Sequence, residues 1–358
     1  MHPSLNSLKS TLNGPILITG HTGFKGTWLT LLLEHLGVEV IGYSLPAQKD
    51  SLYARLGRDG KVKEFLADIR DLSSVNKAIT KYKPSAIMHL AAQPLVNESY
   101  ITPRETFEVN LMGTVNLLDS FMTRQTSRAF MAITTDKVYK NENLGIRFKE
   151  SDPLCGKDPY SASKVAAEAA VAAWQQLARR GGSPKIVALR AGNVIGGGDW
   201  ANDRLIPDLI RGFSSGQTVK VRNPESTRPW QHVLDPLLGY LLALDYVLSG
   251  KELTSINFGP FEASLRVREV VELSREIWGN EARVDFVEPQ EIALEASNLD
   301  LDSDLAKKIL NWKPVWDQAS AVKQTNQWWK ELLVNRRDPL ELSRREIEFA
   351  INAYSEKN

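Results

Sequence analysis

The segment PILITGHTGFKG, Pro15–Gly26, decides the fold. Its first five residues form a short apolar run that predicts a buried strand, and the segment Phe24–Leu36 predicts a helix. A GxxGxxG pattern, made by Gly20, Gly23 and Gly26, lies where the strand passes into the helix. Glycines in such a turn let the backbone approach a pyrophosphate, and the helix N-terminus offers N–H groups and partial positive charge. We therefore expect a dinucleotide site here, with a simple tight turn as the alternative.

Apolar strands continue to alternate with helices up to about residue 191. Continuous apolar strands between helices indicate a parallel sheet that is buried on both faces, and its crossovers are right-handed. The expected fold class is α/β, a Rossmann-like doubly wound parallel sheet with a smaller C-terminal substrate-binding lobe. Further strands are expected at Val38–Tyr43, Val62–Leu66, Ser85–Leu90, Arg128–Thr134 and Lys185–Arg190, and further helices at Asp71–Lys81, Thr102–Thr123 and Tyr160–Arg179.

The pattern of the sequence divides the chain into three parts. Residues 1–191 are expected to form the dinucleotide-binding domain, to which the chain returns near residues 253–258. Beyond residue 191 Gly, Pro, Trp and Asn become frequent and the strands shorten, so residues 192–315 are expected to build mainly the substrate-binding lobe. Residues 316–358 are charged and predicted to be helical.

Composition and charge exclude several classes of function. The net charge is +1 with acidic and basic residues mixed along the chain, whereas a nucleic-acid-binding surface needs clustered basic residues. Cys155 is the single cysteine of the sequence, so no internal disulfide can form, and we interpret it as structural. The first residues lack the apolar core of a signal peptide, and no early apolar stretch is long enough to span a bilayer. A cytoplasmic protein without a metal site or a membrane partner is expected.

Tyr160 and Lys164 form a YxxxK pair at the start of a predicted helix. Four residues make about one helical turn, so both side chains lie on one face. A neighbouring ammonium and the positive nicotinamide of a bound cofactor both favour the phenolate and are expected to lower the pKa of Tyr160, which would let the phenol take a proton from a hydroxyl group. YxxxK also occurs by chance in ordinary amphipathic helices, so the pair gains weight only from its surroundings.

Those surroundings are the polar residues that end an earlier strand. Thr135, Asp136 and Lys137 follow the apolar run that ends at Thr134. The carboxyl ends of parallel strands are the places where such sheets bind ligands. We therefore expect the three side chains to meet Tyr160 at one site, although a polar strand exit is the plain alternative.

Two positions bear on the choice of cofactor. An acidic residue often ends the second strand of a Rossmann fold and holds the adenosine ribose. Here that strand ends Gly42-Tyr43-Ser44-Leu45, with neither a carboxylate nor a basic pair, so NAD and NADP remain open at this position. Asp68 follows the third strand and is expected either to reach the adenine amine or to serve as a turn or helix cap.

The order of these motifs resembles the nucleotide-sugar branch of the extended short-chain dehydrogenases. The carriers of this resemblance are GHTGFKG (20–26), HLAAQ (89–93), TTDKVY (134–139), DPYSASK (158–164) and RAGNVIGGGDW (190–200). More narrowly, GHTGFKGTWL, HLAAQPLV, AGNVIGGGDW and RPWQHVLDPL resemble the CDP-glucose 4,6-dehydratases. The matches run from about residue 15 to 240, and the strings GNVIGGGDW and RPWQHV are specific, whereas GxxGxxG and YxxxK are not.

The resemblance implies NAD as the cofactor and assigns roles by position. Tyr160 matches the oxidising base, Lys164 its supporting lysine, Thr135 the hydroxyl beside the phenol, and Asp136 the acid that protonates the leaving C6 hydroxyl. At Lys137 the related dTDP-glucose enzymes have a glutamate that removes the C5 proton, so here either this lysine, another group or water does so. The implied cofactor contacts are Gly20, Gly23, Phe24, Lys25, Gly26, Asp68, Ile69, Leu90, Ala91 and Ala92, together with Tyr160 and Lys164.

The implied reaction oxidises the sugar at C4, eliminates water across C5 and C6, and returns the hydride to C6. The implied substrate-binding residues are Gln93, Asn193, Arg204, Leu205, Arg228, Trp230 and His232, with a core role as an equal alternative for Trp230 and His232. Arginines suit a diphosphate because the guanidinium makes paired, charge-assisted hydrogen bonds. Small residues on the helix after Tyr160 predict a homodimer or higher homo-oligomer, or else close packing on the chain's own sheet.

Two competing functions stay open. A nucleotide-sugar 4-epimerase or reductase shares the scaffold but needs no acid at C6, which would leave Asp136 unexplained. A non-catalytic NAD-sensing or scaffold protein would not need an intact Tyr160, Lys164 and Thr135.

Overall fold

The computed structural model describes residues 8–181, 185–279, 282–287 and 299–356. A seven-stranded sheet forms its centre, in the order β11-β6-β5-β4-β1-β2-β3. All neighbouring strands of this sheet run parallel. The strands are β1 (Ile16–Thr19), β2 (Val40–Ser44), β3 (Lys63–Leu66), β4 (Ala86–His89), β5 (Ala129–Ile133), β6 (Lys185–Ala191) and β11 (Ser255–Phe258). The predicted doubly wound parallel sheet is confirmed.

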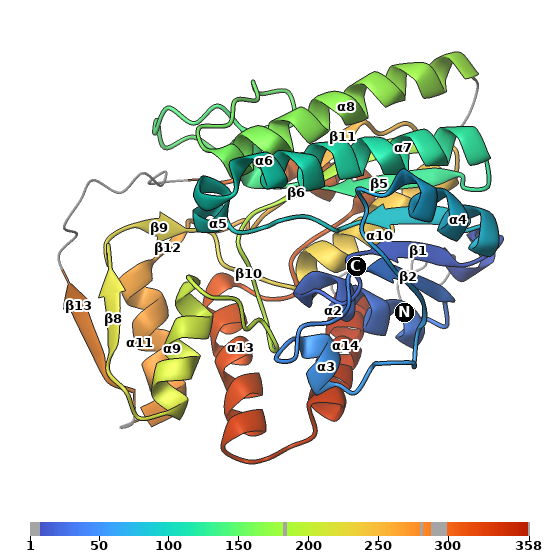
Figure 1. Cartoon of the computed structure of the whole chain (residues 1–358). Coiled ribbons are helices and arrows are strands. Elements are labelled where there is room, and N and C mark those ends of the chain that lie inside the picture. The colour runs from blue at the N-terminus through green and yellow to red at the C-terminus, as the bar shows by residue number, and fades with distance from the viewer. Residues whose placement is uncertain (1–7, 182–184, 280–281, 288–298, 357–358) are drawn as a thin grey trace.

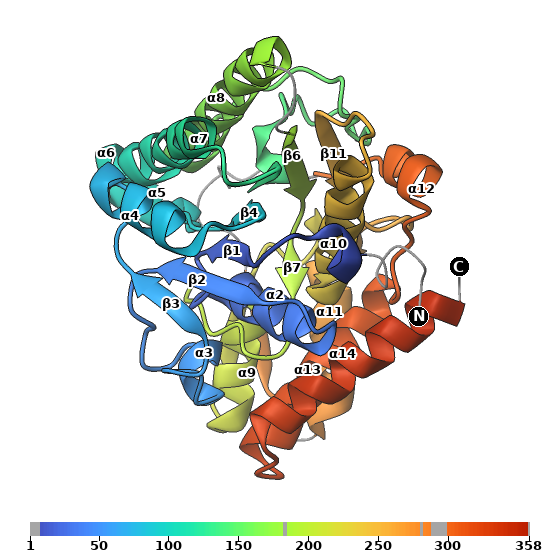
Figure 2. The ribbon, with the colours of Figure 1, turned by 90° about the vertical axis from the view of Figure 1, so that its right-hand side faces the viewer.

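Helices cover both faces of the sheet because successive side chains of each strand point to opposite faces. On β1, Leu17 belongs to one buried apolar cluster, whereas Ile16 and Ile18 belong to another. The first cluster is covered by the layer of α4, α7 and α8, and the second by α2 and α10 (Figures 1 and 2). These helices span α2 (Phe24–His35), α4 (Leu72–Tyr82), α7 (Gly113–Arg124), α8 (Pro159–Gly181) and α10 (Leu234–Leu248).

The predicted long helix at Thr102–Thr123 is not one regular α-helix. It consists of α6 (Pro103–Phe107), a π-helical turn η1 (Glu108–Met112) and α7. The shorter elements α3 (Leu52–Arg55) and α5 (Val96–Ile101) lie in the connections after β2 and β4. A π-helical turn inserts one residue into the helical repeat and often occurs at functional sites.

A smaller lobe lies beside the carboxyl ends of the strands (Figure 1). It contains three two-stranded sheets, β7 with β10, β8 with β13, and β9 with β12. Their bounds are β7 (Val194–Ile195), β8 (Val219–Arg222), β9 (Thr227–Arg228), β10 (Gln231–His232), β12 (Leu265–Arg266) and β13 (Val284–Val287). The helices around them are α9 (Leu205–Ser214) and α11 (Val267–Trp278), whereas α12 (Asp304–Leu310) packs on α10 and β11.

The C-terminal segment forms two helices with different neighbours. Helix α13 (Gln318–Leu333) packs on α9, α11 and β10 of the smaller lobe, whereas α14 (Pro339–Glu356) packs on α2 and α10. The last helix therefore joins the small lobe to the dinucleotide-binding part. Among the described residues, no helix is both long and apolar enough to cross a membrane.

Candidate active site

The glycine-rich turn lies at the carboxyl end of β1, where the strand order reverses between β1 and β4. Gly20 has a φ of 75°, and a Cβ there would lie 2.8 Å from the backbone nitrogen of Ala91. A Cβ on Gly26 would lie 2.1 Å from the carbonyl oxygen of Gly20. The N-cap residue of α2 is Gly23, which has no side chain to cap the helix, and the first helical turn contains no acidic residue. The N–H groups of this turn, which includes Phe24, therefore suit the diphosphate of a dinucleotide.

The loop after β4 forms the opposite wall of this turn. The backbone N–H groups of Leu90 and Ala91 both donate to the Thr19 hydroxyl, at 3.2 Å each. His89 is held between the hydroxyls of Thr19 and Thr114, and burial lowers its pKa to about 3. His89 thus packs as a neutral side chain, while Leu90, Ala91 and the following Ala92 are half-buried.

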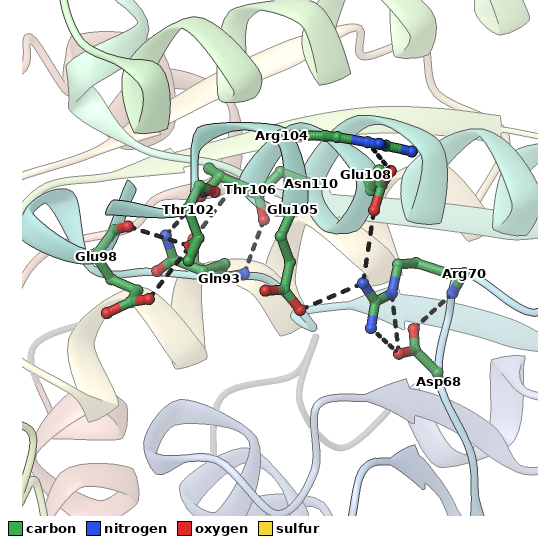
Figure 3. A network of polar contacts seen from close by, with 10 residues as sticks. All are labelled: Asp68, Arg70, Gln93, Glu98, Thr102, Arg104, Glu105, Thr106, Glu108 and Asn110. Atoms are coloured by element: carbon green, nitrogen blue, oxygen red, sulfur yellow. Dashed lines mark hydrogen bonds and ion pairs between the residues drawn. The ribbon is translucent and has the colours of Figure 1, made fainter. Parts of the chain in front are cut away.

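Gln93 uses its whole side chain to hold this loop (Figure 3). Its Nε2 donates to the Thr106 hydroxyl at 2.9 Å, and its Oε1 accepts from the backbone N–H of Leu95 at 2.6 Å. The side chain of Asn110 accepts from the backbone N–H of Gln93 at 2.8 Å and donates to its carbonyl. The structure therefore places the predicted sugar contact in a loop-holding role.

Asp68 lies in an ionic network that follows the carboxyl end of β3 (Figure 3). Its carboxylate accepts from the backbone N–H of Arg70 at 2.8 Å and from the guanidinium of the same residue. These hydrogen bonds lower the pKa of Asp68. The N-cap of α4 is Asp71, so Asp68 does not cap that helix and holds a turn instead, and its contact with the adenine amine stays a prediction. Ile69, next in the chain, is buried against Gly113.

At the end of β2 two hydroxyl groups stand where an acidic residue often binds ribose. The hydroxyls of Thr22 and Ser44 lie 2.7 Å apart, and Thr22 also donates to the carbonyl of Leu45 at 3.1 Å. Because these groups are neutral, they would neither attract nor repel the 2′-phosphate of NADP.

The predicted catalytic residues meet at the carboxyl end of β5. Thr135 caps the 3₁₀ turn η2 (Asp136–Val138) and donates its hydroxyl proton to Oδ1 of Asp136 at 2.7 Å. A hydrogen bond also joins the hydroxyls of Thr135 and Tyr160. Tyr160, Thr135 and Asp136 are all buried, with exposed fractions of 8%, 8% and 2%. Phenol, hydroxyl and carboxylate therefore form one continuous chain of contacts.

The protonation of Tyr160 differs from the expectation. Burial raises the pKa of this phenol to about 12, outweighing the Thr135 hydroxyl and the charge of Arg204, which lower it, while Asp136 raises it further. The expected lowering, which counted the positive nicotinamide, is therefore not reached in the protein alone, since removing a phenolate from water costs more than these neighbours return. A bound positive nicotinamide would act in the lowering direction.

Two lysines of this site have depressed pKa values. Burial lowers the pKa of Lys164 to about 8, against the opposing charge of Glu168. Desolvation likewise lowers the pKa of Lys25 to about 8, and Arg204, Asp136 and Lys164 are close enough to Lys25 to act on it electrostatically. Lys25 thus points toward the catalytic groups and donates to the Tyr240 hydroxyl at 3.4 Å. Lys137, whose side chain is half-buried, donates its backbone N–H to Thr135.

Arg204 extends the charged cluster into the small lobe. Its guanidinium donates to the buried carboxylate of Asp199 at 2.8 Å, and it acts electrostatically on both Tyr160 and Lys25. Arg204 is the N-cap residue of α9, and Leu205 is the first residue of that helix. Asn193 lies between β6 and β7, and its carbonyl accepts from the backbone of Gln231 at 3.1 Å.

The remaining predicted substrate residues are on β9 and β10 or in the link between them. Arg228 is half-buried and donates to the carbonyl of Thr227 at 2.8 Å. His232 is fully buried, with its ring 4.1 Å from that of Trp316 and its Nε2 3.4 Å from a carboxylate oxygen of Glu346. Trp230 is 6% exposed. For these last two predicted contacts, His232 and Trp230, the placement favours the core role that was the alternative.

Comparison with known proteins decides the family. The model of the GDP-mannose 4,6 dehydratase family matches residues 17–325. The chain belongs to this family. It is 38% identical over 341 residues to the CDP-glucose 4,6-dehydratase of Salmonella typhimurium, covering 93% of this chain and 94% of the relative. It is 25% identical to a UDP-glucose 4-epimerase of Rhizobium leguminosarum bv. trifolii, covering 87% and 96% of the two chains.

Solved structures of the dehydratase family and its epimerase relatives share the fold. The Thermus thermophilus UDP-glucose 4-epimerase in complex with NAD superimposes with a TM-score of 0.75 at 25% identity, over 88% of this chain and 99% of that chain. The dTDP-glucose 4,6-dehydratase of Bacillus anthracis, also with NAD, gives 0.75 at 20% identity over 91% and 99%. The predicted resemblance and the predicted fold class are both confirmed.

Three polar residues of this dehydratase-family site were missed in the sequence. Asn110 lies in the π-helical turn and joins Gln93 to Ser163 of α8 by its side chain. Glu168 and Arg190 form a buried ion pair directly behind Lys164. Spacing gave a signal only for Glu168, which follows Lys164 by four residues on one helix face.

Proposed function

We propose that this chain catalyses the NAD-dependent dehydration of CDP-glucose to CDP-4-keto-6-deoxyglucose. The observation that carries the proposal is the contact chain from the Tyr160 phenol through Thr135 to the Asp136 carboxyl group. An oxidising base and an acid within one such chain fit a reaction that acts on adjacent positions of one sugar ring. The 38% identity to a CDP-glucose 4,6-dehydratase over nearly the whole of both chains supports the substrate.

The predicted cofactor, NAD, is supported by related structures that hold it. The turn at Gly20 and Gly26 and the uncapped N-terminus of α2 fit its diphosphate, and Asp68 offers an ionised acceptor at the adenosine end. When bound, NAD accepts the hydride from C4 of the sugar and returns it to C6.

The residues of the chain handle the protons. Tyr160 takes the proton of the C4 hydroxyl, and Thr135 orients that hydroxyl through the same hydrogen-bond chain. The ketone formed at C4 acidifies the hydrogen on C5. Asp136 then donates a proton to the C6 hydroxyl, which leaves as water, while a base removes the C5 proton. Two amines are candidates for this base. Lys137 follows Asp136 directly in the chain, and Lys25 interacts electrostatically with Asp136.

We assign the nucleotide diphosphate to the small-lobe side of the cleft. Arg204 and Arg228 supply the guanidinium groups, with Asn193 and Leu205 beside them. Asp199 orients Arg204 from behind. We also propose a homo-oligomer, because exposed residues of α8, an outer helix in Figure 1, are small or apolar, among them Leu177, which is 49% exposed.

Isotopic labelling tests the proposed function. Purified protein with NAD is incubated with CDP-glucose deuterated at C4, and the product is followed by mass spectrometry and NMR. We expect a 4-keto-6-deoxy sugar with deuterium at C6. A 4-epimerase would return the label to C4 and give no ketone. The same assay on dTDP-, UDP- and GDP-glucose tests the nucleotide, and the absence of a 4-keto-6-deoxy product from all four donors would overturn the proposal.

A further inference from the structure

Behind Lys164 lies a buried acid–base pair with no place in the proposed proton transfers. Glu168 follows Lys164 by one turn on α8, and Arg190 belongs to the neighbouring strand β6. The side chains of the pair are 4% and 5% exposed. Buried charges of this kind are costly unless they are paired and hydrogen-bonded, so their position calls for a physical reason.

Glu168 connects the two halves of the catalytic site. Its Oε1 accepts from the hydroxyl of Thr134 at 2.6 Å, one residue before Thr135 at the end of β5. The same oxygen accepts from Nε of Arg190 at 2.8 Å. The carboxylate therefore ties the strand end that carries Thr135 and Asp136 to the helix that carries Tyr160 and Lys164.

Arg190 extends the connection to the far edge of the sheet. Its Nη1 donates to the Tyr139 hydroxyl at 2.7 Å and to the carbonyl of Glu150 at 3.2 Å. The Tyr139 hydroxyl in turn donates to Asn257 of β11 at 2.8 Å. The pair is thus held from β5, β6, β11 and α8 at once, which leaves little freedom for the carboxylate.

Titratable groups on three elements face Lys164. Glu168 stabilises its ammonium form from α8. Lys25 faces it from α2 as a like charge, and His89 faces it from β4 as a neutral ring, since burial lowers the pKa of His89 to about 3. Glu168 is the group that opposes the burial of Lys164, and the charge of this carboxylate is shared with Arg190.

We propose that Glu168 and Arg190 are a positioning pair that sets the place and the charge of Lys164. Glu168 keeps the buried amine protonated, and Arg190 limits how strongly it does so by neutralising part of the same carboxylate. The proposal rests on the proposed function, and it takes from the resemblance the expectation that the ammonium of Lys164 contacts the cofactor and supports Tyr160.

The test compares Glu168→Gln with Arg190→Gln by measuring the dissociation constant of NAD between pH 6.5 and 9.5, without any sugar. In the unchanged protein, NAD binding is expected to weaken as the pH rises through about 8, because Lys164 is charged below its pKa and neutral above it. Glu168→Gln removes the charge that stabilises the ammonium form of Lys164. It should therefore move this limb of the pH profile, the pH range over which NAD binding weakens, down by about one pH unit. Arg190→Gln frees the carboxylate to act on Lys164 and should move it up.

Controls separate charge from packing. Thr134→Val removes a hydrogen bond to Glu168 without changing any charge and should leave the limb in place. Lys25→Met identifies the share of the limb that belongs to Lys25, whose pKa lies in the same range. Circular dichroism checks that each variant folds. If either single variant does not fold, Glu168→Gln/Arg190→Gln, which removes both charges of the ion pair together, replaces it and should still move the limb down.

Shifts in the same direction for both single variants, or an unmoved limb in folded Glu168→Gln or in the double variant, would overturn the proposal. Because the titration uses NAD alone, it stands apart from the test of the dehydration. If the protein makes no ketone but shows the opposed shifts, the proposed function is wrong and the role of Glu168 and Arg190 stands.

Discussion

The hydroxyl of Thr135 donates to the carboxylate of its chain neighbour Asp136 at 2.7 Å, while the same hydroxyl is hydrogen-bonded to Tyr160. One short side chain thus lies between the proposed base at C4, Tyr160, and the proposed acid at C6, Asp136. The two steps of the dehydration can be separated experimentally by choosing a leaving group that needs no proton.

Asp136→Asn should abolish water loss from CDP-glucose but spare the loss of a better leaving group. General acid catalysis typically contributes 10²–10⁴-fold to a rate, so we expect the turnover of CDP-glucose to fall by roughly that factor. Fluoride leaves as an anion, so release of fluoride from CDP-6-deoxy-6-fluoroglucose should fall far less. A fluoride-selective electrode measures the second rate. Equal losses with both substrates would show that Asp136 is not the acid.

Lys137→Met tests the base that removes the C5 proton. This step is needed whatever leaves from C6, so the variant should lose activity on CDP-glucose and on the 6-fluoro sugar alike. The comparison with Asp136→Asn makes the assay specific to the role. If the variant retains both activities, another group removes the C5 proton. Lys25 would then be substituted next, because it interacts electrostatically with Asp136.

Gly26→Ala should destroy the dinucleotide turn. The added Cβ would lie 2.1 Å from the carbonyl oxygen of Gly20, which is too close for any real contact and is backbone against backbone. We expect loss of NAD binding and a lower melting temperature, measured by fluorescence titration and calorimetry. Gly23→Ala is the matched control, since its Cβ would lie 3.3 Å from the same oxygen. A normal affinity in Gly26→Ala would contradict the assignment of this turn.

Asn110→Ala should destabilise the protein more than Asn116→Ala on the same helical run. Asn110 is buried and its loss leaves the backbone N–H of Gln93 without its partner, a change that typically costs about 1–3 kcal/mol. Asn116 donates to the carbonyls of Ile69 and Arg70 from a half-buried position, where water can replace it. Urea unfolding measures both free energies, and equal values would show that the π-helical turn is held by other contacts.

The fold was predictable because its strands are short, apolar and separated by clear turns. Thr102–Thr123 was the exception. Its apolar spacing fits one long helix, and that spacing does not reveal the one residue that the π-helical turn inserts. Hydrogen bonds of Asn110 to Gln93 and Ser163 accompany this turn. Contacts between residues far apart in the chain decide such local geometry, and a single sequence does not display them.

The candidate site was predictable in its residues and less so in its electrostatics. Thr135 and Asp136 follow the carboxyl end of β5, and Tyr160 lies in the first turn of α8, which packs against η2. In the protein alone the Tyr160 pKa differs from the expectation because burial, which sequence does not measure, outweighs the groups that lower it. Glu168 and Arg190 were missed for a related reason, since 22 positions separate them and the packing of helix α8 on strand β6 brings them together.

The contact between His232 and Glu346 ties the last helix, α14, to the small lobe. Strand β10, which carries His232, begins three residues after Arg228, one of the proposed diphosphate ligands. A chain truncated before α14 would expose the Trp316 ring and remove the acidic neighbour of a buried imidazole. Truncations or fusions that disturb α14 are therefore expected to alter the small-lobe strands beside the proposed diphosphate site.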